Sequence, residues 1–250
     1  MRKIPVMFGF AASALFLAGG CLGPWQQFRN GERYDDAGNY PEAAKCYRKA
    51  AERGHVKAQL ELGRRCHAGK GVEKDYAEAV KWYHRAAEQG CPDAWYALGL
   101  LLLKGEGVAK DPVEAAKYFR RAAEQGHAQS QFELGRCYRD GVGVAKDSVE
   151  GVKWLRLAAQ QGHVGAWYKL GECHLNGAGV EKDPSEGVKW LRLAAEQGHA
   201  GARYKLGMTL CGGDGVPKDM IEGSYWLCKA ARQGHRQARE MCLKLNAKWE

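Results

Sequence analysis

The feature that most limits the fold of this chain is an internal period of 36 residues. The segment RAAEQGH at 121–127 has five close copies, at 49–55, 85–91, 157–163, 193–199 and 229–235. A Leu-Gly pair keeps the same step from 62 to 206, and so does a Gly-x-Gly-Val-x-Lys-Asp segment that begins at 69, 105, 141, 177 and 213. Such a period predicts a solenoid or another stacked array, because one short unit cannot bury its apolar face alone.

Local patterns predict that each copy forms two helices. In the copy that begins at Asp111, this aspartate suits a helix N-cap, Pro112 suits the first helical position, and Gly126 suits a left-handed residue that ends the helix. Residues 128–140 carry a second stripe of apolar side chains at helical spacing. The glycine of each Leu-Gly pair costs about 1 kcal/mol of helix stability relative to alanine, so we expect a neighbouring helix to pass close to it.

The repeated pattern A-x-x-x-L-G, G-x-G-V-x-K-D and A-A-E-Q-G-H resembles the Sel1-like repeat, a relative of the tetratricopeptide repeat. The resemblance covers about residues 25–250. It implies an all-α, right-handed α/α superhelical solenoid that binds proteins or peptides. We expect a short tether at 22–28, a first unit closer to the tetratricopeptide form at 29–54, five Sel1-like repeats at 55–235, and a C-terminal capping helix within 236–250.

Residues 1–21 have a different composition and predict a signal peptide. Arg2 and Lys3 precede an uncharged apolar run from Ile4 to Leu17, which is shorter than the roughly 20 residues of a membrane-spanning helix. The ending LAGGC resembles the lipobox of bacterial lipoproteins, which implies lipidation of Cys21 and membrane anchoring. We expect an exported lipoprotein, with outer-membrane attachment facing the periplasm favoured. Simple secretion and an uncleaved anchor stay open.

Eight further cysteines follow in a compartment that would permit disulfides. Cys46 and Cys66 are each ten residues from Val56, and equal distance from a turn predicts that they bond across the hairpin. Cys228 and Cys242 are each seven residues from His235 and form a weaker candidate pair. We interpret the other four as small buried side chains.

Five histidines recur at one position of the period: His55, His127, His163, His199 and His235. A metal site is not expected, because zinc ligands lie about 2 Å from the ion whereas these side chains are separated by whole repeats. We expect each imidazole to bond backbone at the turn. No cofactor is expected.

A net charge of +9, or about +7 without Arg2 and Lys3, is spread through every unit. No basic run with interleaved aromatics is present, so a nucleic-acid partner is not expected. In tetratricopeptide-like superhelices the first helices line the concave face. On those helices we select positions that vary between copies as partner contacts: Trp95, Leu100, Leu101, Trp167, Lys169, Arg203 and Lys205. The tryptophans could instead fill packing gaps.

These observations predict a non-catalytic scaffold at the cell envelope that holds a protein or peptide on its concave face. Cysteine-rich secreted relatives of the Sel1-like type suggest an alternative, a β-lactamase-like or penicillin-binding hydrolase. The sequence has no H-E-x-x-H motif, and no serine is followed three places later by lysine. A secreted carrier or adhesin is a third interpretation.

Overall fold

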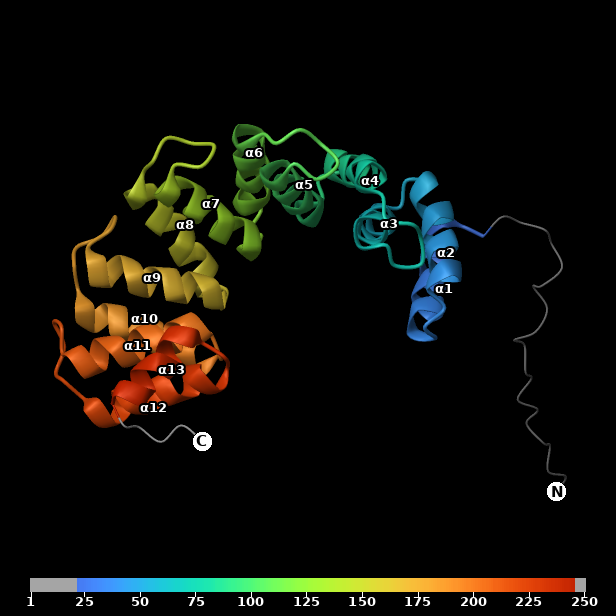
Figure 1. Ribbon diagram of the computed structural model, residues 1–250. Helices are drawn as coiled ribbons and strands as arrows, with labels where there is room; N and C mark the ends of the chain where they lie inside the picture. The colour runs from blue at the N-terminus through green and yellow to red at the C-terminus, as the bar shows by residue number, and fades with distance from the viewer. Residues whose placement is uncertain (1–21, 246–250) are drawn as a thin grey trace, which may run out of the picture.

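The computed structural model describes residues 22–245, and all the regular secondary structure in this part of the chain is helical. The helices follow one another along an open arc from α1 to α13 without folding back (Figure 1). Their bounds are α1 Pro24–Asp36, α2 Tyr40–Glu52, α3 Val56–Ala68, α4 Tyr76–Glu88, α5 Pro92–Lys104, α6 Pro112–Glu124, α7 Ala128–Asp140, α8 Ser148–Gln160, α9 Val164–Asn176, α10 Pro184–Glu196, α11 Ala200–Gly212, α12 Met220–Arg232 and α13 Arg236–Lys244. The predicted α/α solenoid is confirmed.

Successive helices pair into hairpins, and we number the six pairs from α1–α2 to α11–α12 as units 1 to 6. Each helix packs mainly on its neighbours in sequence. The buried side chains form a chain of clusters rather than one centre, and each cluster joins adjacent helices. The hydrophobic core is therefore a continuous spine, as expected for stacked repeats.

The helix boundaries have clear local causes. Asp111 accepts hydrogen bonds from the amides of Val113 and Glu114 and so caps α6, and the equivalent aspartates cap α4, α8, α10 and α12. Each first helix from unit 2 onward ends at a left-handed glycine, such as Gly69 with φ of 72°. These boundaries repeat every 36 residues because the capping residues do.

The Leu-Gly glycines lie where two helices of one unit approach closely. A β-carbon at Gly99 would stand 2.5 Å from the ring of Phe119, and one at Gly135 would stand 2.9 Å from the carbonyl oxygen of Gly151. The cost of glycine within these helices is therefore offset by tight packing, as the sequence predicted.

The expected bounds can be compared with the helix bounds at both ends of the solenoid. Helix α1 begins at Pro24, so most of the segment 22–28, expected as a short tether, is helical. The first unit expected at 29–54 begins within α1. The capping helix of 236–250 is present as α13 but ends at Lys244, and residues 246–250 lie outside the described part.

Candidate partner-binding surface

The first helices of units 2, 4 and 5 carry an ion pair at one position of the period, whereas unit 3 has none there and unit 6 has Lys205 and Met208. Arg64 pairs with Glu61 at 3.1 Å in unit 2, and Arg136 pairs with Glu133 at 3.0 Å in unit 4. In unit 5 the signs are reversed, and Lys169 pairs with Glu172 at 2.7 Å. The equivalent positions of unit 3 are Ala97 and Leu100. These two smaller, uncharged side chains leave a gap where the ion pair would lie.

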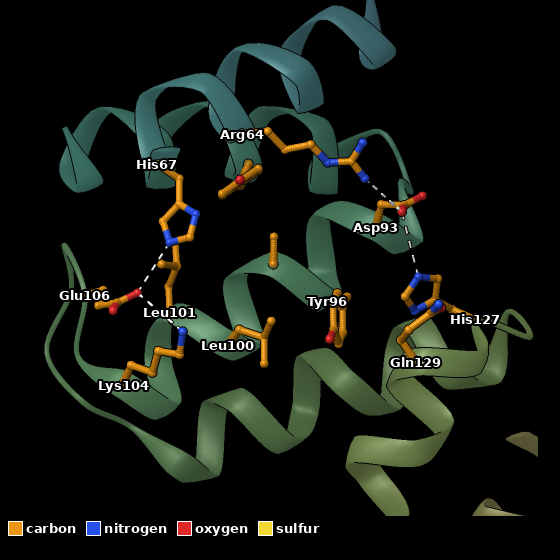
Figure 2. A pocket seen from close by; sticks show the side chains of 12 residues that line it. Arg64, His67, Asp93, Tyr96, Leu100, Leu101, Lys104, Glu106, His127 and Gln129 are labelled. Carbon is orange, nitrogen blue, oxygen red and sulfur yellow. Dashed lines mark hydrogen bonds and ion pairs between the residues drawn. The ribbon is translucent and has the colours of Figure 1, made fainter. Parts of the chain in front are cut away.

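A pocket of about 330 Å³ occupies this gap, with apolar side chains at its base (Figure 2). It is formed by α3, α5 and α7, the first helices of units 2 to 4, and Tyr83 of α4 also lines it. Ala97, Leu100 and Leu101 come from α5 and Tyr96 lies toward one end. The site thus combines an apolar base with a charged surround.

Each end of the pocket holds a carboxylate between two basic side chains. At the start of α5, Asp93 lies 3.2 Å from Arg64 Nη2 and 3.8 Å from His127 Nε2. At the end of α5, Glu106 lies 3.4 Å from His67 Nε2 and 3.8 Å from Lys104 Nζ. Figure 2 shows the two clusters on opposite sides of the apolar base.

The pocket follows α5 for most of its length. Asp93 and Lys104 are eleven residues apart on this helix, which corresponds to about 16 Å at 1.5 Å per residue. An extended peptide advances roughly 3.3 Å per residue, so about five residues could lie between the two charged ends. The surface has the dimensions of a short peptide segment.

His127 contributes to the site and to the fold. Its Nδ1 accepts a hydrogen bond from the amide of Ser130, so in the neutral ring Nε2 carries the proton and points toward Asp93. Burial and the nearby Arg64 guanidinium lower the pKa of His127, and Asp93 opposes them. The imidazole is therefore mainly neutral at pH 7.

The structure confirms the backbone role expected for the repeated histidines. The Nδ1 atoms of His55, His163, His199 and His235 accept amide hydrogen bonds at the start of the next helix, as His127 does. Four of the five rings also stack on an aromatic ring of the preceding first helix, with centroids 4.4–4.6 Å apart. Cys91 makes no such cap, and Leu60 stands where the aromatic partner would be. The unit that lacks the histidine cap thus also lacks the aromatic ring on which a histidine would stack.

Some of the residues predicted to contact a partner have a structural role instead. Trp167 Nε1 donates a hydrogen bond to the carbonyl of Ala159 at 3.0 Å, and Arg203 Nε donates to that of Ala195 at 2.9 Å. Gln59 and Gln131 make the same bond eight residues back. Trp95 packs against the core beside unit 2. For Trp167 and Arg203, the side chain joins consecutive units and is only partly available to a partner.

The remaining predicted contacts differ in exposure. Leu100 is half-buried at the pocket, whereas Leu101 is 2% exposed and so belongs to the base of the pocket rather than to an accessible surface. Lys169 is half-buried and already paired with Glu172. Lys205 is half-buried on α11, and it does not line the pocket. Arg64, Asp93, His67 and Glu106 were missed as a group, since their proximity depends on the packing of α3 against α5.

All eight cysteines of the described part are thiols. Cys46 and Cys66 are separate thiols in this structure, Cys66 buried and Cys46 half-buried. Equal distance from a turn sets the height of a residue along a hairpin but not the direction of its side chain. Cys228 and Cys242 do meet, with their sulfur atoms 3.6 Å apart. Burial raises the pKa of Cys66 and Cys137 to about 11.

No helix among residues 22–245 is both long and apolar enough to cross a membrane. The same residues contain no cluster of three or more histidine, cysteine, aspartate or glutamate side chains suited to a metal ion. Cys21 and the predicted signal peptide lie outside the described residues.

Comparison with known families and structures identifies the repeats. The model of the Sel1 repeat matches six segments: 28–55, 56–91, 92–127, 128–163, 166–199 and 200–235. The first unit, expected to be closer to the tetratricopeptide form, is thus matched as a Sel1 repeat as well. No match was found among curated proteins.

Two solved structures are similar over most of the chain. The c5321 protein of uropathogenic Escherichia coli, described as a protective antigen with an SLR fold, has 33% identity and a TM-score of 0.83. The match covers 91% of this chain and 50% of that one, so this chain spans half the length of that relative. A Sel1 repeat protein from Oxalobacter formigenes has 33% identity and a TM-score of 0.80, with 85% of this chain and 84% of that one covered.

A more distant match shares the fold alone. The immunity protein Pa5087 from Pseudomonas aeruginosa has 21% identity and a TM-score of 0.52, over 85% of this chain and 83% of that one.

Proposed function

Because the chain belongs to the Sel1 repeat family, whose members typically serve as protein-interaction scaffolds, we propose that it is a non-catalytic scaffold that holds a protein or peptide at the bacterial cell envelope. The partner would lie along the first helices, on the concave face of the arc. The pocket of unit 3 would receive an apolar side chain of that partner.

The missing ion pair of unit 3 supports this proposal most strongly. In units 2, 4 and 5 the same surface carries charged pairs, which are stable in contact with water, whereas unit 3 has Ala97 and Leu100 at these positions. Interface anchors typically fill a desolvated pocket that is surrounded by polar groups. The two charged ends would fix the position of the peptide through its polar groups.

The proposed location depends on the N-terminal segment. The basic start, the apolar run and the LAGGC ending support cleavage before Cys21 and lipidation of this residue. Stable membrane attachment requires more than one acyl chain, so a lipoprotein anchor would carry two or three. The solenoid would then face the periplasm from the outer membrane.

Exchange of the two pocket residues for the pair found in units 2 and 4 tests the partner site. In the double variant Ala97→Glu/Leu100→Arg, the introduced side chains should pair as Glu61 and Arg64 do and close the pocket without disturbing the fold. We expect crosslinking pull-down from envelope membranes to recover at least about tenfold less partner, the loss typical of a removed interface anchor.

The second-helix face offers a matched control. Leu157 is 40% exposed at a position where units 2 and 3 have Arg85 and Arg121, so Leu157→Arg also replaces a leucine by the residue of other units. Its partner recovery should equal that of the unmodified protein. Equal recovery by the pocket variant would refute the proposed site.

Mass spectrometry of the mature N-terminus tests the anchor separately. A diacylated or triacylated Cys21 is expected, and Cys21→Ala should release the chain from membranes. An unmodified N-terminus after a different cleavage site would exclude the tether but leave the partner site intact.

A further inference from the structure

The last unit has an open apolar pocket at the end of the arc, where α12 and α13 lie (Figure 1). This end pocket has a volume of about 590 Å³ and shares no residue with the pocket of unit 3. Its apolar lining comes from Met220, Ile221 and Tyr225 of α12 and from Leu245, which follows α13. Ile221 is 88% exposed and Tyr225 is 50% exposed. Large apolar side chains gathered at one exposed place are typical of a surface that another segment covers.

Tyr225 departs from the equivalent residue of every earlier unit. That position holds lysine in units 1 to 5, namely Lys45, Lys81, Lys117, Lys153 and Lys189. Four of these lysines pair with the glutamate three residues earlier, and their side chains are 64–73% exposed. A cation in contact with water is thus replaced by an aromatic ring in the unit at the end of the stack.

The residue that joins one second helix to the next is changed as well. Arg48 of α2 pairs with Glu78 of α4, and Arg192 of α10 pairs with Glu222 of α12. The equivalent residue of α12 is Cys228, which lines the end pocket. The end pocket therefore lies on the face of α12 where another second helix would pack, and no helix of residues 22–245 covers it.

In units 2 to 6 the loop after the first helix returns to the start of the preceding second helix. A β-carbon at Gly107 would stand 2.6 Å from Tyr76, the first residue of α4. The nearest atoms to a β-carbon at Gly71, Gly143, Gly179 and Gly215 also belong to the first residue of a second helix: Tyr40, Pro112, Ser148 and Pro184. The corresponding residue for the chain that leaves α13 is Met220, the first residue of α12.

The chain after α13 has a residue suited to the end pocket. Residues 246–250, with the sequence Asn-Ala-Lys-Trp-Glu, lie outside the described residues and directly follow Leu245, which itself lines the pocket. By the period of 36, Trp249 is equivalent to Gly213, two positions before Gly215. Tryptophan is the side chain that buries a large apolar area in one contact.

We propose that the segment 246–250 docks in the end pocket, with the indole ring of Trp249 against Met220, Ile221 and Tyr225. The segment would cover α12 as the loop of the next unit covers each earlier second helix. It would close the apolar end of the solenoid and keep it from associating with a second copy of the chain. The end pocket and the proposed partner site have no residue in common, so the two proposals can be tested separately.

Intramolecular photocrosslinking in the purified protein tests this docking. A photoreactive phenylalanine analogue replaces Trp249, and mass spectrometry of the digest identifies the residues that it reaches. We expect crosslinks within one molecule to residues 220–225. Ile221→Lys should lower their yield about threefold or more, because an apolar contact does not admit an ammonium group.

Val149→Lys is the matched control, because Val149 occupies the same position of the period on α8 and is 57% exposed. Circular dichroism should show unchanged helix content in both lysine variants, and Val149→Lys should leave the crosslink yield unchanged. Crosslinked dimers joined through residues 220–225 would overturn the proposal and identify a second copy as the occupant. Crosslinks only elsewhere, none at all, or an equal yield from Ile221→Lys would also overturn it.

Discussion

A β-carbon at Gly135 would contact both the backbone of Gly151 and the side chain of Leu155, with each nearest atom 2.9 Å away. Alanine has a helix propensity about 1 kcal/mol better than that of glycine, but α7 and α8 would have to move apart to admit it. We expect Gly135→Ala to lower the free energy of unfolding by about 1–3 kcal/mol, as overpacking typically does. Denaturant unfolding measures this change.

Gly212 provides the control for this substitution. It is the last residue of α11, and an added β-carbon would meet only the carboxylate of Asp214, which can rotate away. Gly212→Ala should be neutral or slightly stabilising. A Gly135→Ala protein as stable as the original would show that the helices need no close approach at this point.

Single side chains also show why some contacts could not be predicted. The period identified the repeat position that Trp167 and Arg203 occupy, but in the structure both side chains donate hydrogen bonds to backbone carbonyls of the preceding unit. This role depends on a carbonyl eight residues earlier, which a comparison of equivalent repeat positions does not reveal. The role of the histidines was predictable, because a polar residue between a turn glycine and a helix has few other partners.

At the level of the helices, the imidazole caps predict how stability depends on pH. Burial lowers the pKa of His55, His127, His163 and His199 below the unfolded value of 6.5. Protonation would also remove the Nδ1 acceptor that caps each helix. Between the lowered values and about 6.5 the unfolded chain binds more protons than the folded one, so the free energy of unfolding should fall as pH drops through this window.

Thermal unfolding between pH 8 and pH 5 measures this dependence. Asparagine is a good N-cap that does not titrate. His163→Asn/His199→Asn should therefore lose some stability at pH 8, because the stacking on Phe132 and Tyr168 is removed, but lose less further stability on acidification. The carboxylates with lowered pKa, such as Glu78 and Glu222, act below pH 4.5 and do not interfere. An unchanged slope in the double variant would contradict the capping account.

The last two helices carry a pair of thiols placed for oxidation. Cys228 of α12 and Cys242 of α13 have sulfur atoms 3.6 Å apart, and α13 packs mainly on α12. A disulfide here would close a loop of about 15 residues and stabilise the end of the solenoid by about 3 kcal/mol. We expect oxidised glutathione to accept the two electrons and two protons of these thiols, which gives the disulfide and two molecules of reduced glutathione. Amide exchange in α13 should then become slower.

Burial and the neighbouring thiol of Cys228 raise the pKa of Cys242 to about 12, so this oxidation should be faster at alkaline pH. Cys228→Ser provides the control, because it should neither form the bond nor gain exchange protection. If the unmodified protein is oxidised but amide exchange in α13 does not become slower, the disulfide does not stabilise the C-terminal end of the solenoid.

At the level of the whole molecule, the period alone predicted the architecture, because each 36-residue copy contains its own caps, turn glycines and apolar stripes. The pocket of unit 3 was only partly predictable. The sequence identified Leu100 as a departure from the other copies, but it could not show that Asp93 and Glu106 stand at either end, since that depends on how α3, α5 and α7 pack. The partner sites of a solenoid lie between units, and their geometry follows from the curvature of the stack.

Photocrosslinking in living cells tests most directly whether recognition belongs to the first-helix face of unit 3. A photoreactive phenylalanine analogue replaces Leu100 in one protein and Leu157, exposed on α8, in another. We predict a discrete crosslinked species of higher mass from position 100 and none from position 157. Adducts from position 157 with none from position 100 would contradict the account.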